Sequence, residues 1–151
     1  MQDREEKPTR VTEVFGFENT IRRELPLFLA NVPAGFPSPA DDYVDRKLDL
    51  NEHLVRHPAA TFFVRVEGES MTGAGIHSGD ILIVDRALEP ADRKIVIAVV
   101  NGELTVKRIR MINGALYLAA ENPRYEPIRI NGEDEDFKIW GVVIWVLHEV
   151  V

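Results

Sequence analysis

The segment "TFFVRVEGESMTGAGIHSGDILIVD" (residues 61–85) decides the fold class, because it predicts a strand, a glycine-rich bend and a second strand. Residues 61–68 and 80–85 are short runs rich in β-branched and aromatic side chains, which favour strands. The glycines between them permit unusual backbone angles and the close approach of another chain. We therefore expect a bend that follows one strand and carries Ser70 near its start.

The chain on both sides of this segment predicts a mostly β domain. Further strands are expected at residues 94–100, 103–110, 115–120 and 139–147. The Asn-Gly pair in "VVNGEL" (99–104) favours a tight hairpin turn between two of them. One short helix precedes the strands, with Asp49 as its cap, Glu52 at the capping-box spacing and Pro58 as its stop.

The composition limits the classes of function. A chain of 151 residues with 45% hydrophobic and 28% charged residues is long enough for one globular domain and a tail. The formal net charge of −7 argues against general nucleic-acid binding, which needs a basic face, and we expect no direct sequence-specific DNA binding. The sequence has no cysteine, which excludes disulfides, thiol catalysis and thiolate metal sites.

Two segments bear on where the protein resides. The first residues, "MQDREEKPTR", are charged and lack the apolar core of a secretory signal. The longest apolar run, "IWGVVIWVL" (139–147), is well short of the roughly 20 residues that cross a bilayer. We therefore expect a cytoplasmic protein that has no membrane partner.

Residues 1–34 differ from the rest of the chain. Their apolar residues follow no clear period and prolines interrupt them, which predicts an extended, mobile arm. The apolar patch "LPLFLANV" (25–32) can pack back on the domain or serve as a docking peptide. The next stretch, "NVPAGFPSPA" (31–40), is rich in proline, which favours an extended and accessible backbone. On composition it is either a linker or a segment that another site recognises.

The histidines give no metal site in the sequence. His53 and His57 are four residues apart on the predicted helix and could touch one metal ion, but no third ligand lies nearby. We interpret both as solvated helix residues, and His77 and His148 as isolated. No metal and no cofactor are expected.

Ser70 is the candidate nucleophile. A serine on a sharp turn after a strand can be presented while neighbouring amides, here those of Ser70 and Met71, point at the same space. A nucleophile and an oxyanion hole require this geometry. The alternative is structural, because serine is also common in turns and as a helix cap.

Lys107 is the candidate base, since a serine hydroxyl is a poor nucleophile without one. It lies in the middle of "ELTVKRIR" (103–110), where a lysine is usually solvated or guards a sheet edge. If its side chain turns inward, burial lowers the pKa, so that a neutral amine can accept the serine proton. Strand alternation does not settle which way Lys107 points.

Five segments carry a resemblance to a known family: "GFPSPADDYVDRKLDLNEHLVRHPAATFFVRVEGESM", "SGDILIVD", "IVIAVVNGELTVKRI", "ENPRYEPI" and "GVVIWVL". In order and spacing they resemble the UmuD-type SOS mutagenesis proteins of the LexA-like self-cleaving serine peptidases, nearly continuously over residues 35–151. The resemblance implies a peptidase domain of short, strongly bent strands with a Ser-Lys dyad at Ser70 and Lys107. It also implies self-cleavage between Ala34 and Gly35, which would remove residues 1–34 from the domain 35–151.

The same resemblance implies partners. The truncated chain would form a homodimer and act as accessory subunit of a UmuC-like Y-family polymerase in translesion DNA synthesis. A RecA–single-stranded DNA filament would trigger the cleavage. The segment where the family contacts the polymerase sliding clamp corresponds here to Leu25, Pro26, Leu27 and Phe28.

The chain departs from the family pattern at three places. The arm is longer than in familiar members, and residues 1–24 match no pattern that we recognise. The residue before the expected cut is alanine, as in LexA, where the UmuD-type protein has cysteine. Arg93 and Lys94 replace the usual Gly-Asp before a strand, which changes a turn and leaves the dyad intact.

Three other functions remain open from the sequence. A signal-peptidase-like enzyme also pairs a Ser-Met motif with a strand lysine, but it would need a membrane anchor. A phage-repressor-like protein would carry a helix-turn-helix domain, for which residues 1–34 are too short. A non-enzymatic dimeric scaffold would tolerate Ser70→Ala with its function intact.

Overall fold

The computed structural model describes residues 7–17, 24–28, 44–132 and 137–151. Its strands are β1 (Arg10–Gly16), β2 (Glu24–Phe28), β3 (Val44–Asp49), β4 (Thr61–Glu67), β5 (Ile81–Asp85), β6 (Ile95–Val100), β7 (Glu103–Ile112), β8 (Ala115–Ala119), β9 (Ile128–Ile130) and β10 (Phe137–Leu147). The helices are short: α1 (Leu50–Leu54) and two 3₁₀ turns, Pro58–Ala60 and Thr72–Ala74. The expected mostly β class with one short α-helix is confirmed.

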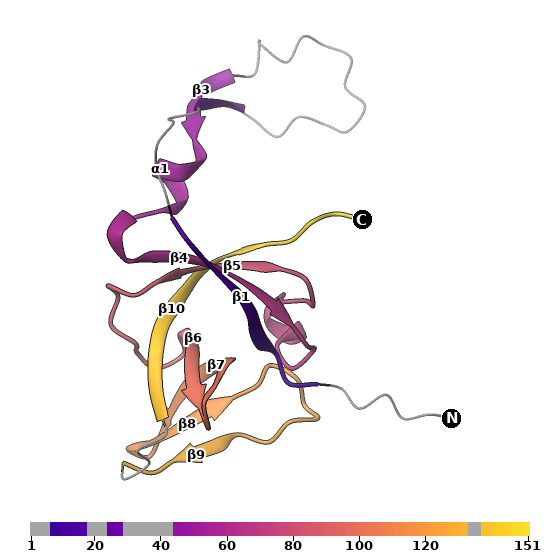
Figure 1. Ribbon diagram of the computed structural model, residues 1–151, viewed down its shortest axis with the longest axis vertical. Helices are drawn as coiled ribbons and strands as arrows, with labels where there is room; N and C mark the ends of the chain where they lie inside the picture. The colour runs from indigo at the N-terminus through magenta and orange to yellow at the C-terminus, as the bar shows by residue number, and fades with distance from the viewer. Residues whose placement is uncertain (1–6, 18–23, 29–43, 133–136) are drawn as a thin grey trace.

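Most strands belong to one antiparallel sheet in the order β1-β4-β5-β10-β6-β7-β8-β9. β1 also pairs with β7 through Arg10 and Thr105, so the strands from β1 round to β7 close into a ring, and β8 and β9 continue beyond it (Figure 1). β1 therefore covers the edges of both β4 and β7, which would otherwise carry unpaired backbone groups.

Two clusters of buried apolar side chains hold the sheet together. The first consists of Val64, Val66, Met71, Ile76, Leu82, Val84, Ile97 and Val106. The second consists of Val96, Ala98, Ile109, Leu118 and Val142. Because successive residues of a strand point to opposite faces, β6 and β7 each contribute to both clusters, and both of their faces are covered.

Two Asn-Gly pairs close tight hairpins. Asn101 and Gly102 have φ values of 50° and 77°, and Asn113 and Gly114 have φ values of 51° and 77°. Positive φ at both central residues is what a type I′ turn requires. The hairpin expected at "VVNGEL" is thus confirmed between β6 and β7, and the second pair joins β7 to β8.

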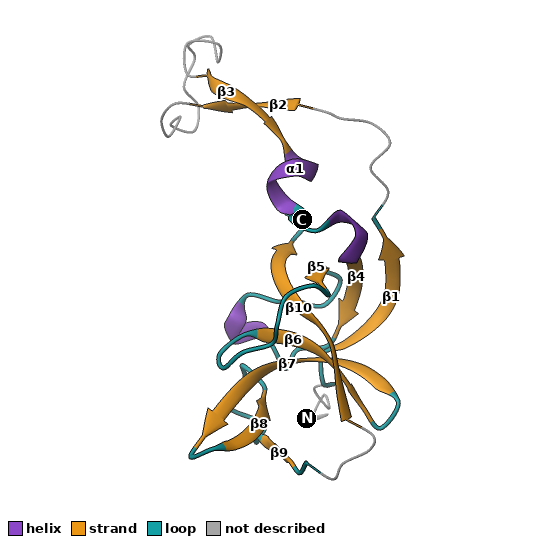
Figure 2. Ribbon diagram, turned by 90° about the vertical axis from the view of Figure 1, so that its left-hand side faces the viewer, coloured by secondary structure: helices purple, strands orange, loops and turns teal. Residues whose placement is uncertain are grey.

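The helix begins where the sequence predicts but ends earlier than the expected stop at Pro58. The Asp49 carboxylate accepts hydrogen bonds from the amides of Asn51 (3.0 Å) and Glu52 (3.4 Å), which caps α1. α1 ends at Leu54, and Pro58 starts a 3₁₀ turn instead of continuing it. Figure 2 shows α1 between the large sheet and a separate two-stranded ribbon formed by β2 and β3. No helix in the described part of the chain is long and apolar enough to span a membrane.

The main differences from the sequence predictions lie before α1. We predicted no strand there, yet β1, β2 and β3 form. β1 gave no signal because most of its side chains are exposed, and backbone hydrogen bonds to β4 hold it in place. The three-residue β9 was also missed. The mobility expected of residues 1–34 stays a prediction.

Candidate active site

Ser70 lies on the bend that follows β4. Gly68 has a φ of 111°, which only glycine adopts readily, and the chain turns away from the strand there. The ends of the bend are tied together, since the Gly79 amide donates to the Val66 carbonyl over 2.7 Å and the Val66 amide donates to the Asp80 carbonyl over 3.0 Å. Within this bend the Ser70 side chain is completely buried.

Lys107 reaches the bend from β7. Its neighbour Val106 belongs to the first core cluster, so Lys107 projects from the opposite face of the strand. Only 6% of Lys107 is exposed, and its Nζ lies 3.5 Å from Ser70 Oγ. The structure therefore brings together the two residues that the sequence singled out.

Burial sets the protonation preference of Lys107. Removal of the ammonium from water disfavours the charged form, so the pKa of Lys107 is lowered from its ordinary value. Within the described ranges no carboxylate forms an ion pair with Lys107 to oppose this shift. The Tyr125 ring centroid, 5.6 Å from Nζ, attracts the ammonium only weakly at that distance. Desolvation therefore decides the direction in which the pKa of Lys107 shifts.

The amides expected to form an oxyanion hole lie on the same bend. Ser70 and Met71 are both completely buried. Among the residues that the structure describes, neither backbone N–H has a hydrogen-bond acceptor. Buried donors without acceptors are what a developing oxyanion needs.

The loop after β8, which begins the segment "ENPRYEPI", holds the nucleophile bend through contacts that could not be predicted from the sequence. The Gly73 amide donates to the Glu121 carbonyl over 2.8 Å, and the Asn122 side-chain amide donates to the Glu69 carbonyl over 3.2 Å. A Cβ on Gly73 would lie 2.5 Å from the Glu121 carbonyl oxygen, so this approach requires glycine.

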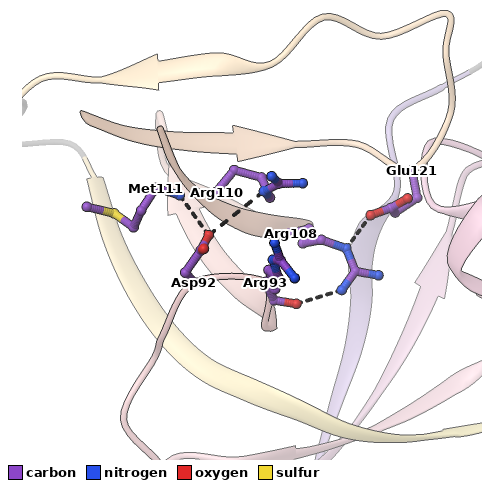
Figure 3. A network of polar contacts seen from close by, with 6 residues as sticks. All are labelled: Asp92, Arg93, Arg108, Arg110, Met111 and Glu121. Carbon is purple, nitrogen blue, oxygen red and sulfur yellow. Dashed lines mark hydrogen bonds and ion pairs between the residues drawn. The ribbon is translucent and has the colours of Figure 1, made fainter. Parts of the chain in front are cut away.

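Arg108 holds the same loop and projects from the face of β7 opposite to Lys107. Its Nε donates to the Glu121 carboxylate, and its Nη1 donates to the Arg93 carbonyl over 2.6 Å (Figure 3). Asp92, beside Arg93, accepts a hydrogen bond from the Met111 amide over 2.8 Å. The network joins the turn before β6, the strand β7 and the loop after β8.

Residues that the sequence analysis assigned to the arm also reach the site. The Thr9 amide donates to Ser70 Oγ over 2.8 Å, and Thr9 is completely buried. The Thr9 carbonyl accepts a hydrogen bond from the Val106 amide (3.1 Å), and the Lys7 carbonyl accepts one from the Glu69 amide (3.0 Å). These contacts are made by the backbone, so no motif or apolar pattern could have revealed them.

Three of the four histidines differ from the expectation. His57 lies beyond the end of α1, and its Nδ1 is 2.6 Å from the buried carboxylate of Asp85. His148 Nδ1 is likewise 2.6 Å from Asp80, and the His77 and His148 rings lie 5.3 Å apart. His53 is exposed on α1, as expected of a solvated helix residue. His57 is also exposed but lies outside the helix and pairs with Asp85, and His77 and His148 are not isolated. Over the described residues no group of three or more potential ligands could hold a metal ion.

Two predicted sites lie partly or wholly outside the described residues. Ala34 and Gly35, the expected cleavage site, fall outside them. For the clamp-contact residues Leu25, Pro26, Leu27 and Phe28 the structure describes the strand β2 alone, which pairs with β3. Both assignments stay predictions.

Comparison with known proteins decides the family. The model of the family described as Peptidase S24-like matches residues 26–144, a range that contains Ser70 and Lys107. The chain belongs to this family. Protein SamA of Salmonella typhimurium is 44% identical over 132 residues, which cover 87% of this chain and 91% of that protein. Protein MucA of Escherichia coli is 42% identical over 125 residues, 83% of this chain and 85% of that protein.

The similarity to a more distant member of the family covers only part of that protein. The LexA repressor of Colwellia psychrerythraea is 35% identical over 124 residues, which cover 82% of this chain but only 58% of that protein. The UmuD-like relatives instead match over most of their length. Within the peptidase family the chain is therefore a UmuD-like SOS mutagenesis protein, as the resemblance implied.

Proposed function

We propose that the protein cleaves its own backbone between Ala34 and Gly35, with Ser70 as nucleophile and Lys107 as general base. One observation carries the proposal: the Nζ of a buried lysine lies 3.5 Å from the Oγ of a buried serine. Burial lowers the pKa of Lys107, which raises the share of neutral amine available to accept a proton. The family membership supports the same chemistry.

The proposed reaction follows the usual course of an acyl transfer. Neutral Lys107 accepts the hydroxyl proton while Ser70 Oγ bonds to the carbonyl carbon of Ala34. The tetrahedral intermediate collapses, the bond to the Gly35 nitrogen breaks, and the Lys107 ammonium gives its proton to the leaving amine. Water then adds to the ester with Lys107 again as base, which releases the Ala34 carboxylate and restores Ser70.

Backbone groups of the bend serve the transition state in this proposal. The amides of Ser70 and Met71 have no acceptor among the described residues and can donate to the oxyanion. Each such donor typically contributes about a hundredfold or more to the rate. The bend keeps them in position through its contacts with Glu121 and Asn122.

The proposal extends to what the cleaved product does. Residues 35–151 form a homodimer and act as accessory subunit of a UmuC-like Y-family polymerase, and a RecA–single-stranded DNA filament triggers the cut. Before cleavage, Leu25 to Phe28 contact the sliding clamp. These partners rest on the resemblance to UmuD-type proteins and on the similarity to SamA and MucA.

Mass spectrometry of the purified chain tests the peptidase. After incubation at alkaline pH we expect two products, residues 1–34 and 35–151, whose masses also fix the position of the cut. Ser70→Ala and Lys107→Ala should stay full length. Lys94→Ala on the surface is the matched control and should cut at the rate of the unmodified chain. A fragment beginning at Gly35 from either active-site variant would refute the dyad.

A pull-down separates the enzyme from a scaffold. We expect a Y-family polymerase to be retained more strongly by residues 35–151 than by the uncut Ser70→Ala chain. Equal retention by both chains would favour the non-enzymatic scaffold, because the polymerase would then not depend on cleavage.

A further inference from the structure

Residues 7–9 lie between the nucleophile bend and β7, beside Ser70, and the space that they fill is called the groove below. On one side the amides of the nucleophile bend face this segment, with Glu69 donating to the Lys7 carbonyl over 3.0 Å. On the other side β7 faces it, since the Val106 amide and the Thr105 hydroxyl both donate to the Thr9 carbonyl over 3.1 Å. The groove thus offers backbone donors from two directions, as sites that bind extended peptides do.

The occupant continues directly into β1. Arg10–Gly16 pairs antiparallel with β4, from Arg10 opposite Glu67 to Gly16 opposite Phe62. Val11 is half-buried and packs against the first core cluster, whereas Val14 on the same strand is 46% exposed. Residues 7–16 are therefore a single added strand, and Val11 is its apolar anchor.

The occupant lies in the groove in an orientation that Ser70 cannot cut. The N–H of Thr9 points at Ser70 Oγ over 2.8 Å. In a planar trans peptide the carbonyl oxygen points opposite to the N–H, so the Pro8 carbonyl oxygen points away from the nucleophile. It lies against Gly68 instead, where an added Cβ would be 2.5 Å from it. Attack requires the hydroxyl above the plane of a carbonyl carbon, and here the hydroxyl oxygen lies on the amide side.

We propose that residues 7–16 are an inhibitory strand: they fill the groove that binds an extended peptide, and they must leave before Ala34–Gly35 can reach Ser70. The inhibitory role of the strand rests on the proposed self-cleavage. Its occupancy of the groove does not depend on that proposal. A second chain that is to bind Ser70 must displace Thr9, because among the described residues the Thr9 amide and Lys107 Nζ already form the hydrogen bonds to Oγ.

Thr9 weakens the binding of the strand in the groove. The Oγ1 of Thr9 is buried and has no hydrogen-bond partner in the described part of the chain. An unpaired buried hydroxyl weakens a contact, and an apolar group of the same shape removes that penalty. Thr9→Val should therefore hold the strand more tightly, whereas Val11→Asp should release it by placing a charge against the core.

Two variants with opposite expected effects test the proposal by the rate of self-cleavage. Val11→Asp should cut at least tenfold faster than the unmodified chain, and Thr9→Val at least threefold slower. Val14→Asp adds the same charge on the exposed side of β1. Its rate of self-cleavage should be at least fivefold lower than the rate of Val11→Asp. A peptide of residues 6–17 added to Val11→Asp should slow its cutting, and the same peptide with aspartate at position 11 should not. Equal rates in all the variants would overturn the inhibitory role.

Hydrogen exchange measures occupancy without cleavage. In a Lys107→Ala background, which keeps the Ser70 hydroxyl, the amides of residues 10–16 should be protected, and Val11→Asp should speed their exchange at least tenfold. Exchange of these amides at the rate of a free peptide in the Lys107→Ala chain would overturn the occupancy. If no chain cuts at all, the proposed peptidase fails and the inhibitory role with it, and the exchange result still decides whether the strand binds.

Discussion

The carbonyl oxygen of Glu121 approaches Gly73 so closely that a Cβ there would lie 2.5 Å from it, and the Gly73 amide donates to this oxygen over 2.8 Å. The contact joins the loop after β8 to the bend that carries Ser70. Because Tyr125 of that loop also faces Lys107, one segment contacts both the bend that carries Ser70 and the Lys107 side chain. The spacing of the site therefore depends on a glycine that takes no part in chemistry.

Gly73→Ala should destabilise the protein and slow its self-cleavage. The added methyl group meets a backbone carbonyl that cannot rotate away, and overpacking of this kind costs about 1–3 kcal/mol. Urea unfolding measures the loss. Gly132→Ala is the control, since nothing lies within 4 Å of its added Cβ and its effect should stay within about 0.5 kcal/mol. Equal unfolding midpoints for the two variants would contradict the tight approach.

The rate of self-cleavage should rise with pH above neutrality and level off below pH 10.5, the ordinary pKa of a lysine. The base must be neutral to accept the serine proton, and burial lowers the pKa of Lys107, so the neutral form accumulates at lower pH than in a solvated lysine. Fragment yield over a pH series measures the profile. A rate that does not change between pH 7 and pH 10 would rule out Lys107 as the titrating base.

Lys107→Met should stabilise the fold at neutral pH, even though it abolishes cleavage. In the pH range between the lowered pKa and 10.5, the unfolded chain holds a proton that the folded chain has lost, so the stability of the unmodified protein rises with pH there. Below that range folding buries a charged group, which is unfavourable. We expect the melting temperature of Lys107→Met to be about 2–4 °C higher at pH 7.

The advantage of Lys107→Met should shrink as the pH rises toward 10.5, because the folded chain has then lost the buried charge and the unfolded chain is losing its proton as well. Thermal unfolding of both chains at pH 7 and pH 10 provides the comparison. Lys94→Met, on the surface, should leave the melting temperature within about 1 °C at both pH values. A gain for Lys107→Met that is the same at both pH values would mean that packing, and not charge, is responsible.

Much of the fold could be predicted from local patterns. β4, β5, β6 and β7 have runs rich in β-branched residues, and Asn-Gly turns join β6 to β7 and β7 to β8, so these signals act within a few residues. β1 could not be predicted in this way. Its side chains are largely exposed, and its position is set by backbone hydrogen bonds to a strand some fifty residues away in the sequence.

In the candidate site, too, some features could be predicted from local sequence patterns and others could not. Residue type and spacing singled out Ser70 and Lys107, but alternation could not fix the direction of Lys107, because β7 is covered on both faces: Val106 joins one core cluster and Ile109 the other. The contacts of Thr9 and Glu121 were missed for a different reason. They use backbone atoms, which every residue possesses, so the sequence carries no mark of them.

The resemblance to UmuD-type proteins led us to expect glycine at position 93, and the backbone conformation of Arg93 shows why glycine would suit it. Arg93 has a φ of 72°, in the region that favours glycine, and it is held there from both sides. Its amide donates to the Ile109 carbonyl over 2.8 Å, and its carbonyl accepts from Arg108 over 2.6 Å. The backbone bonds therefore keep a turn that the side chain disfavours.

Arg93→Gly should raise the free energy of unfolding by about 0.5–1 kcal/mol. Relief of the left-handed conformation gains about 1–2 kcal/mol per residue, and the greater freedom of glycine in the unfolded chain removes part of that gain. Urea unfolding measures the difference. Arg129→Gly on the strand β9 is the matched control, and it should lose about 0.5–1 kcal/mol because extended backbone gives glycine no advantage. If Arg93→Gly were instead less stable than the unmodified chain, the arginine side chain would have to make a contact worth more than the strain it imposes.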